Sequence, residues 1–144
     1  MTARLWLVFF AEPDGPAWWA RLLRPGFRHV CAASWYAAEE RWVYFNPSRC
    51  GTSVQIFTRE AFPPVLTALL DQSSAVLRFA SRFERGNAPA LAFCVGEIKA
   101  LLGIRCAALT PWQLYWALQD LGAEPVREKP CVVDDREAAA SSAP

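Results

Sequence analysis

Three residues in this sequence are of the types that together perform nucleophilic catalysis: Cys94, His29 and Asn46. A cysteine attacks as its thiolate, and an imidazole that removes the thiol proton works best when a third polar group fixes its tautomer and orientation. Free N–H groups and the dipole at a helix N-terminus also favour the anion of a cysteine placed there. These three residues therefore predict a thiol hydrolase site if the fold brings them together.

A β-hairpin is the element expected to join His29 to Asn46. The β-forming stretches FRHVCAAS (27–34) and RWVYFN (41–46) flank the polar WYAAEE. If the hairpin is centred within WYAAEE, the residue numbers of facing pairs sum to about 75, which predicts that His29 lies opposite Asn46. A register slip of one residue would break this match, and a slip of two would make the pair diagonal.

A short amphipathic helix is the element expected to carry Cys94. Residues 92–102, AFCVGEIKALL, place Phe93, Ile98 and Leu101 near one face, so the helix begins close to the cysteine. The apolar neighbours Phe93 and Val95 act against the effect of the helix start, because an apolar flank raises a thiol pKa.

The remaining pattern predicts an α+β fold with a mostly antiparallel sheet and packed helices. The helix at 110–122 has the clearest boundaries, with Thr110 as N-cap, Pro111 at N1, Gln113 at N3 and Gly122 past its end. We expect one domain over residues 1–122 and a flexible tail over 123–144, since DDREAAASSAP is polar, small and unpatterned. The other expected elements are strands at 4–11, 52–59 and 75–83, and helices at 16–23 and 60–72.

Composition narrows the classes of function. The net charge of +1 disfavours a nucleic-acid-binding module, and LWLVFFA is too short for a membrane span or a signal peptide. The five cysteines are odd in number and lack a CxxC pair, which favours reduced thiols over a disulfide scaffold or a zinc site. We expect no cofactor and no metal, and the seven Trp residues indicate an aromatic core and an exposed apolar face for a partner.

Packing alone offers another interpretation of the same residues. Free cysteine is among the residues most often buried, and a single histidine on a strand is commonly a hydrogen-bonded structural residue. Cys31 shares the strand face of His29 and is a rival thiol, although it lacks the activation of a helix start.

A family resemblance supports the catalytic interpretation. FRH on a strand, a following strand that ends in YFNP, and a later helix that begins FCVGEIKALLGI resemble a circularly permuted form of the papain-like fold of NlpC-type cell-wall peptidases and lecithin retinol acyltransferase-like proteins. FCVGEIKALLGI followed by LTPWQLYWAL also resembles small proteins of tailed phages and prophages. The resemblance covers roughly residues 25–120.

The resemblance implies a cysteine peptidase or amidase with Cys94 as nucleophile, His29 as general base and Asn46 as orienting residue. The Cys94 backbone N–H would form part of an oxyanion hole, with Asn87 a candidate for the second donor. Peptidoglycan stem peptides are the implied substrate, in the cytoplasm of a bacterial host or in a phage particle. An alternative is a non-catalytic virion or assembly protein that keeps the fold and contacts other phage structural proteins.

Overall fold

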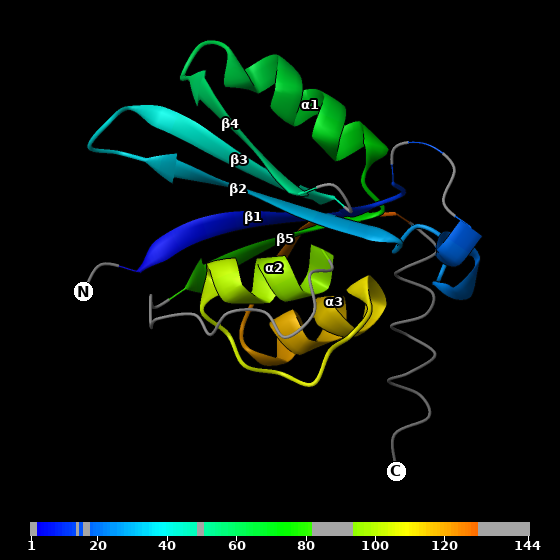
Figure 1. Ribbon diagram of the computed structural model, residues 1–144. Helices are drawn as coiled ribbons and strands as arrows, with labels where there is room; N and C mark the ends of the chain where they lie inside the picture. The colour runs from blue at the N-terminus through cyan, green and yellow to red at the C-terminus, as the bar shows by residue number, and fades with distance from the viewer. Residues whose placement is uncertain (1–2, 14, 16–17, 49–50, 82–93, 130–144) are drawn as a thin grey trace.

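The computed structural model describes residues 3–13, 15, 18–48, 51–81 and 94–129, which form an α+β structure with a six-stranded antiparallel sheet and three α-helices (Figure 1). The sheet order is β4-β3-β2-β1-β5-β6. None of the helices in these ranges is both long and apolar enough to cross a membrane. The elements are the strands β1 (Arg4–Ala11), β2 (His29–Tyr36), β3 (Arg41–Ser48), β4 (Gly51–Thr58), β5 (Ala75–Ser81) and β6 (Glu124–Glu128), the helices α1 (Phe62–Gln72), α2 (Cys94–Leu102) and α3 (Pro111–Asp120), and a 3-10 helix η1 (Trp18–Leu22).

The predicted class and order of elements are confirmed, with two corrections. The helix expected at 16–23 is a 3-10 helix over Trp18–Leu22 in the described residues. The tail expected from residue 123 is wrong at Glu124–Glu128, because this segment pairs with β5 as the edge strand β6. Side chains hold β6 in place: Arg78 contacts Glu124, and Tyr115 donates a hydrogen bond to Glu128. The rest of the predicted tail, from residue 130, lies outside the described residues.

The sheet has two differently covered sides. Helices α2 and α3 cover one side and α1 covers the other, which we call the α2–α3 side and the α1 side (Figure 1). Alternation along the strands divides the core accordingly. On the α2–α3 side, Val30 and Ala32 of β2 join the larger cluster of buried residues; on the α1 side, Cys31 and Ala33 join the smaller one.

Helix α3 is fixed in the way that its sequence predicts. Thr110 accepts a hydrogen bond from the Gln113 backbone N–H, and the Gln113 side chain accepts from the Thr110 N–H, which completes the capping box. The Nζ of Lys99 donates to the carbonyl oxygens of Cys106 at 2.6 Å and Ala108 at 3.0 Å. This ammonium group ties α2 to the segment that leads into α3.

Candidate functional site

His29 and Asn46 meet at the end of the sheet where β2 begins. The Nε2 of His29 lies 2.6 Å from the Oδ1 of Asn46, and both side chains are half-buried. Because an amide oxygen only accepts hydrogen bonds, this contact places the imidazole proton on Nε2. Nδ1 of His29 is then the basic nitrogen, with a lone pair that can take a proton from another group.

The register that brings these residues together differs from the predicted one. Facing pairs such as Ala32↔Phe45 have residue numbers that sum to 77 rather than 75, so the prediction that His29 lies directly opposite Asn46 is wrong. A four-residue turn causes the shift, since Tyr36 pairs with Arg41 and Glu40 takes a φ of 50°. A shift of two residues keeps every side chain on its face, so the contact persists as a diagonal one.

The pairing of β2 with β3 ends close to this contact. The β2–β3 pairing runs from Tyr36↔Arg41 to Ala32↔Phe45 and goes no further toward His29 in the described residues. Beyond this point β3 continues to pair with β4 as far as Ser48↔Gly51. The hydrogen bond between His29 and Asn46 therefore links β2 and β3 just beyond their last paired residues.

Cys94 is the first residue of α2 and lies on the α2–α3 side, where its half-buried side chain packs against the larger core cluster. Burial raises the pKa of the Cys94 thiol, while hydrogen bonds from the backbone N–H groups of Val30, Val95 and Cys94 itself act to lower it. Burial is the larger influence, so the pKa stays above its ordinary value of 9.0. The backbone N–H groups at the start of α2 lower the Cys94 pKa, as predicted. Burial outweighs them, so Cys94 is a neutral thiol at neutral pH.

His29 forms a hydrogen bond with Asn46, whereas Cys94 is linked to β2 through the backbone N–H of Val30. Val30, whose N–H reaches the Cys94 sulfur, directly follows His29 in β2. Strand alternation places the His29 side chain with Cys31 on the α1 side, whereas Cys94 lies on the opposite side. Among the described residues, no hydrogen bond connects Cys94 to His29.

The other thiols occupy different surroundings. Cys31, the rival thiol, is only 3 % exposed and packs in the smaller cluster, and Cys106 is half-buried between α2 and α3. Cys50, Cys131 and the predicted oxyanion donor Asn87 lie outside the described residues. Within the described ranges, no three His, Cys, Asp or Glu side chains gather as metal ligands.

One contributor to this site has no signature in the sequence. The Val30 backbone N–H acts on the Cys94 sulfur across two elements that are more than sixty residues apart. Any residue type except proline supplies such a donor, so only the three-dimensional arrangement reveals it.

Comparisons with models of known families, with curated proteins and with solved structures found no match.

Proposed function

We propose that this protein is a thiol hydrolase that cleaves an amide bond, with Cys94 as nucleophile, His29 as general base and Asn46 as the residue that orients the imidazole. The observation that carries the proposal is the 2.6 Å contact between His29 Nε2 and Asn46 Oδ1. This contact leaves Nδ1 basic in the residue that precedes Val30, whose N–H binds the Cys94 sulfur. His29 and Asn46 thus lie on the α1 side of the sheet and Cys94 on the α2–α3 side, and Val30, next to His29 in β2, links the two sides.

The chemistry starts from a neutral thiol, because burial raises the Cys94 pKa. His29 Nδ1 takes the thiol proton as the sulfur attacks the carbonyl carbon, and the carbonyl electrons move to its oxygen. The imidazolium then gives this proton to the leaving amine as the C–N bond breaks and a thioester forms. Water attacks the thioester with His29 again as base, which releases the acid and restores the thiol. Asn46 Oδ1 accepts a hydrogen bond from Nε2–H throughout and stabilises the imidazolium.

This mechanism requires the imidazole and the sulfur, which lie on opposite sides of the sheet, to approach each other beyond the end of the β2–β3 pairing. The β2–β3 pairing ends at Ala32↔Phe45, so His29 lies beyond the last paired residues of this hairpin. Catalytic hydrogen bonds are often long in a free enzyme and shorten when substrate binds. The proposal places the reacting carbonyl beyond the end of the β2–β3 pairing, against the start of α2.

The substrate class rests on the resemblance of the FRH, YFNP and FCVGEIKALLGI segments to the permuted NlpC-type proteins. Peptidoglycan stem peptides contain amide bonds that such an enzyme would cleave. FCVGEIKALLGI and the following LTPWQLYWAL also resemble small proteins of tailed phages and prophages, which suggests that the enzyme acts in a phage particle or during lysis of the host. The α+β architecture with an antiparallel sheet and a helix that starts at the cysteine is compatible with this assignment.

Acylation by p-nitrophenyl acetate tests the nucleophile and the base together. We expect a burst of p-nitrophenolate and an acetyl group on Cys94, identified by peptide mass spectrometry. His29→Ala should slow this step by about a hundredfold, the usual scale of general base catalysis. Asn46→Ala should slow it less, because the imidazole remains but loses its orientation.

Cys106→Ser is the matched control, since Cys106 is another half-buried thiol that the mechanism does not use. This variant should keep the wild-type rate, and circular dichroism should show that each variant is folded. Acetylation at Cys31 or Cys106 instead of Cys94, or an unchanged rate in folded His29→Ala, would refute the proposal.

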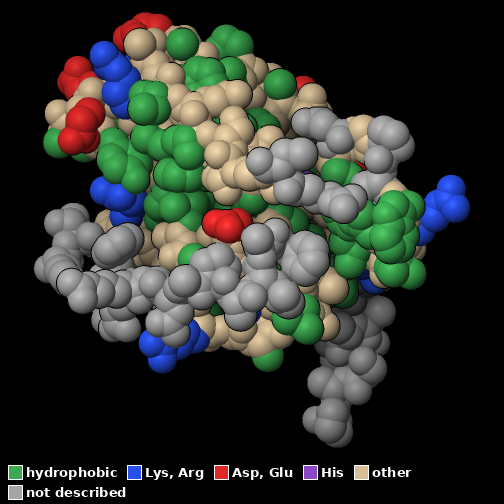
Figure 2. All heavy atoms as spheres, viewed as in Figure 1, with side chains coloured by type: hydrophobic (Ala, Val, Ile, Leu, Met, Phe, Trp, Pro, Cys, Tyr) green, Lys and Arg blue, Asp and Glu red, His purple; other side chains and the backbone are tan. Residues whose placement is uncertain are grey.

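A virion or assembly role without catalysis is the second candidate, and the outer strands favour it. Val54 and Ile56 of the edge strand β4 are 51 % and 67 % exposed, and they pair with Phe45 and Val43 on the α2–α3 side of the sheet. Figure 2 shows hydrophobic side chains gathered over this part of the sheet. An exposed apolar strand at a sheet edge is typical of a contact surface for another protein. This role predicts that Cys94 reacts without any dependence on His29.

A further inference from the structure

The two edges of the sheet differ in how well they are protected from pairing with another chain. The strand at one edge, β6, is short, contains Pro125 and has an irregular register against β5. It also carries the charged residues Glu124, Arg127 and Glu128. Short length, proline, bulges and charge are the features by which natural sheets prevent an edge from pairing with a further strand. The β6 edge is therefore protected.

The strand at the other edge, β4, has none of these features. It runs for eight residues, Gly51–Thr58, and pairs with β3 in regular register over its whole length. Its sequence, GTSVQIFT, contains neither a charged residue nor a proline. Every residue of β4 except Phe57 is exposed. Within the described ranges β3 is its only neighbouring strand, so its outer edge offers backbone N–H and C=O groups to another strand.

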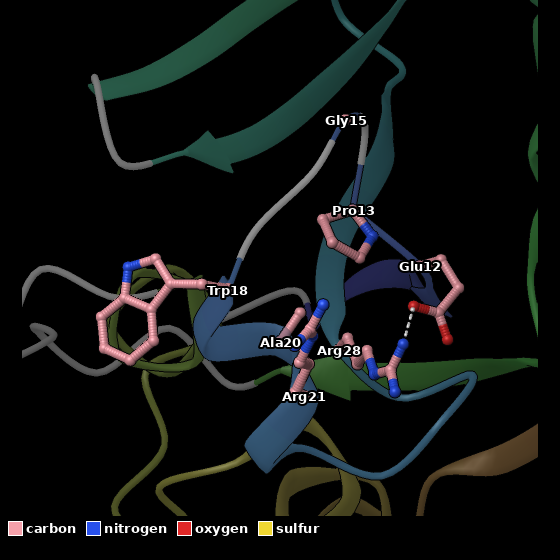
Figure 3. A pocket seen from close by; sticks show the side chains of 7 residues that line it. All are labelled: Glu12, Pro13, Gly15, Trp18, Ala20, Arg21 and Arg28. Atoms are coloured by element: carbon pink, nitrogen blue, oxygen red, sulfur yellow. Dashed lines mark hydrogen bonds and ion pairs between the residues drawn. The ribbon is translucent and has the colours of Figure 1, made fainter.

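Charged side chains near other exposed parts of the molecule form ion pairs within the chain. At the end of β1, Arg28 Nη1 lies 3.3 Å from Glu12 Oε2 (Figure 3). At the β6 edge, Arg127 Nη1 lies 3.1 Å from Asp71 Oδ1. No charged side chain is available for such a pair on β4. A strand that binds β4 is therefore recognised through main-chain hydrogen bonds and uncharged side chains.

The residue types along β4 are nearly symmetric about Gln55. Val54 and Ile56 lie on either side of it, and Thr52 and Thr58 lie three residues away. In an antiparallel pair of two β4 strands centred on Gln55, Val54 of each copy faces Ile56 of the other, and Thr52 faces Thr58. Facing residues then have numbers of the same parity, so every side chain stays on its own side of the sheet.

We propose that two copies of this chain form a dimer through antiparallel pairing of their β4 strands, with the two-fold axis at Gln55. An interface that is identical on both copies must be complementary to itself, as this strand is. A charge at the axis would face the same charge of the other copy, and β4 carries none.

Side chains of the α2–α3 side reinforce this pairing. Val54 and Ile56 are exposed there, and their β3 partners Phe45 and Val43 lie on the same side. The two copies join these residues into one apolar strip. The protected β6 edge ends the assembly at the dimer. The dimer goes beyond both functions proposed above and depends on neither.

Sedimentation velocity of the full chain, with reductant present, tests the dimer. At about 100 µM protein the wild type should be mainly dimeric, which a Kd of roughly 10 µM is enough to ensure. Val54→Lys places an ammonium group at two equivalent positions of the interface and should weaken dimerisation at least about tenfold. Val126→Lys is the matched control, because Val126 lies in the other edge strand and is 52 % exposed, against 51 % for Val54. It should dimerise like the wild type.

Substitutions of Gln55 test the position of the two-fold axis. Gln55→Glu and Gln55→Lys each place two like charges opposite each other, so each variant alone should be mainly monomeric. An equimolar mixture should recover the dimer, because a carboxylate of one copy then faces an ammonium group of the other. Gln55 is exposed, so neither substitution disturbs the core, and circular dichroism should show both variants folded.

Several results would overturn the dimer. A monomeric wild type would contradict it and would indicate a strand of a different protein as the partner of β4. A dimer that persists in Val54→Lys, or that is lost equally in Val126→Lys, would exclude β4 as the interface. A mixture of the two Gln55 variants that stays monomeric would exclude the axis at Gln55, and species larger than a dimer would exclude a closed two-fold arrangement.

Discussion

The two sides of the sheet differ in how firmly their helices are held. On the α2–α3 side, α3 buries Leu114, Tyr115 and Leu118 completely, and a full capping box fixes its start. On the α1 side, α1 buries only Phe62 completely, and its N-cap residue Ala61 provides no side-chain cap. The α2–α3 side therefore contributes more buried apolar surface to the free energy of folding than the α1 side does. The α1 side, where His29 and Asn46 lie, is the less firmly packed of the two.

Leucine-to-alanine substitutions on the two sides should show the largest difference. Leu118→Ala removes a fully buried side chain from the larger cluster and should lower the free energy of unfolding by about 3 kcal/mol. Leu66→Ala in α1 removes a half-buried side chain from the smaller cluster and should cost about 1 kcal/mol. Urea denaturation followed by circular dichroism measures both. Equal losses would mean that α1 contributes as much to the core as α3 does.

Helix capping should show a smaller difference in the same direction. Thr110→Ala removes the hydroxyl half of the capping box of α3 and should cost about 1 kcal/mol. Thr58→Ala removes a single contact, in which Thr58 Oγ1 accepts the Ala61 N–H at 3.2 Å before α1, and should cost roughly 0.5 kcal/mol. The same denaturation experiment compares the two, with Thr67→Ala on the exposed face of α1 as a control for threonine loss. A larger loss for Thr58→Ala would reverse the ranking of the two helix starts.

Local sequence signals account for much of this fold. Thr110 and Gln113 mark the start of α3 because a capping box depends on residues only three apart. Strand β6 escaped prediction because Glu124–Glu128 is an exposed edge with a proline and no clear alternation, and its stability comes from contacts with distant residues such as Arg78. The hairpin register was missed by two because the positive φ of Glu40, a residue type that rarely adopts it, lengthens the turn.

In the candidate site, too, the sequence predicts what depends on local pattern and misses what depends on tertiary packing. Residue parity within one hairpin was enough to predict that His29 and Asn46 share a face, and their hydrogen bond agrees with it. The position of Cys94 depends on how α2 crosses β2, which no local pattern specifies. The sequence predicted two opposed effects on the thiol, activation by the helix start and a raised pKa from the apolar neighbours Phe93 and Val95. The packing of α2 on the larger cluster buries the sulfur, and this burial is the larger influence on its pKa.

The raised pKa of Cys94 leads to the smallest effect, a change of stability with pH that belongs to the α2–α3 side. Its folded pKa lies above the ordinary value of 9.0, so the folded state holds the thiol proton more tightly than the unfolded state does. The resulting stability is fully present below the unfolded pKa and is lost as pH rises through the folded pKa. Urea denaturation at about pH 8 and about pH 10, with reductant present, should therefore show a larger alkaline loss in the wild type than in Cys94→Ala. Other titrating groups are common to both proteins and cancel in this difference. An equal loss in both would mean that the sulfur ionises in the folded protein as readily as in water, which would contradict the raised pKa of Cys94.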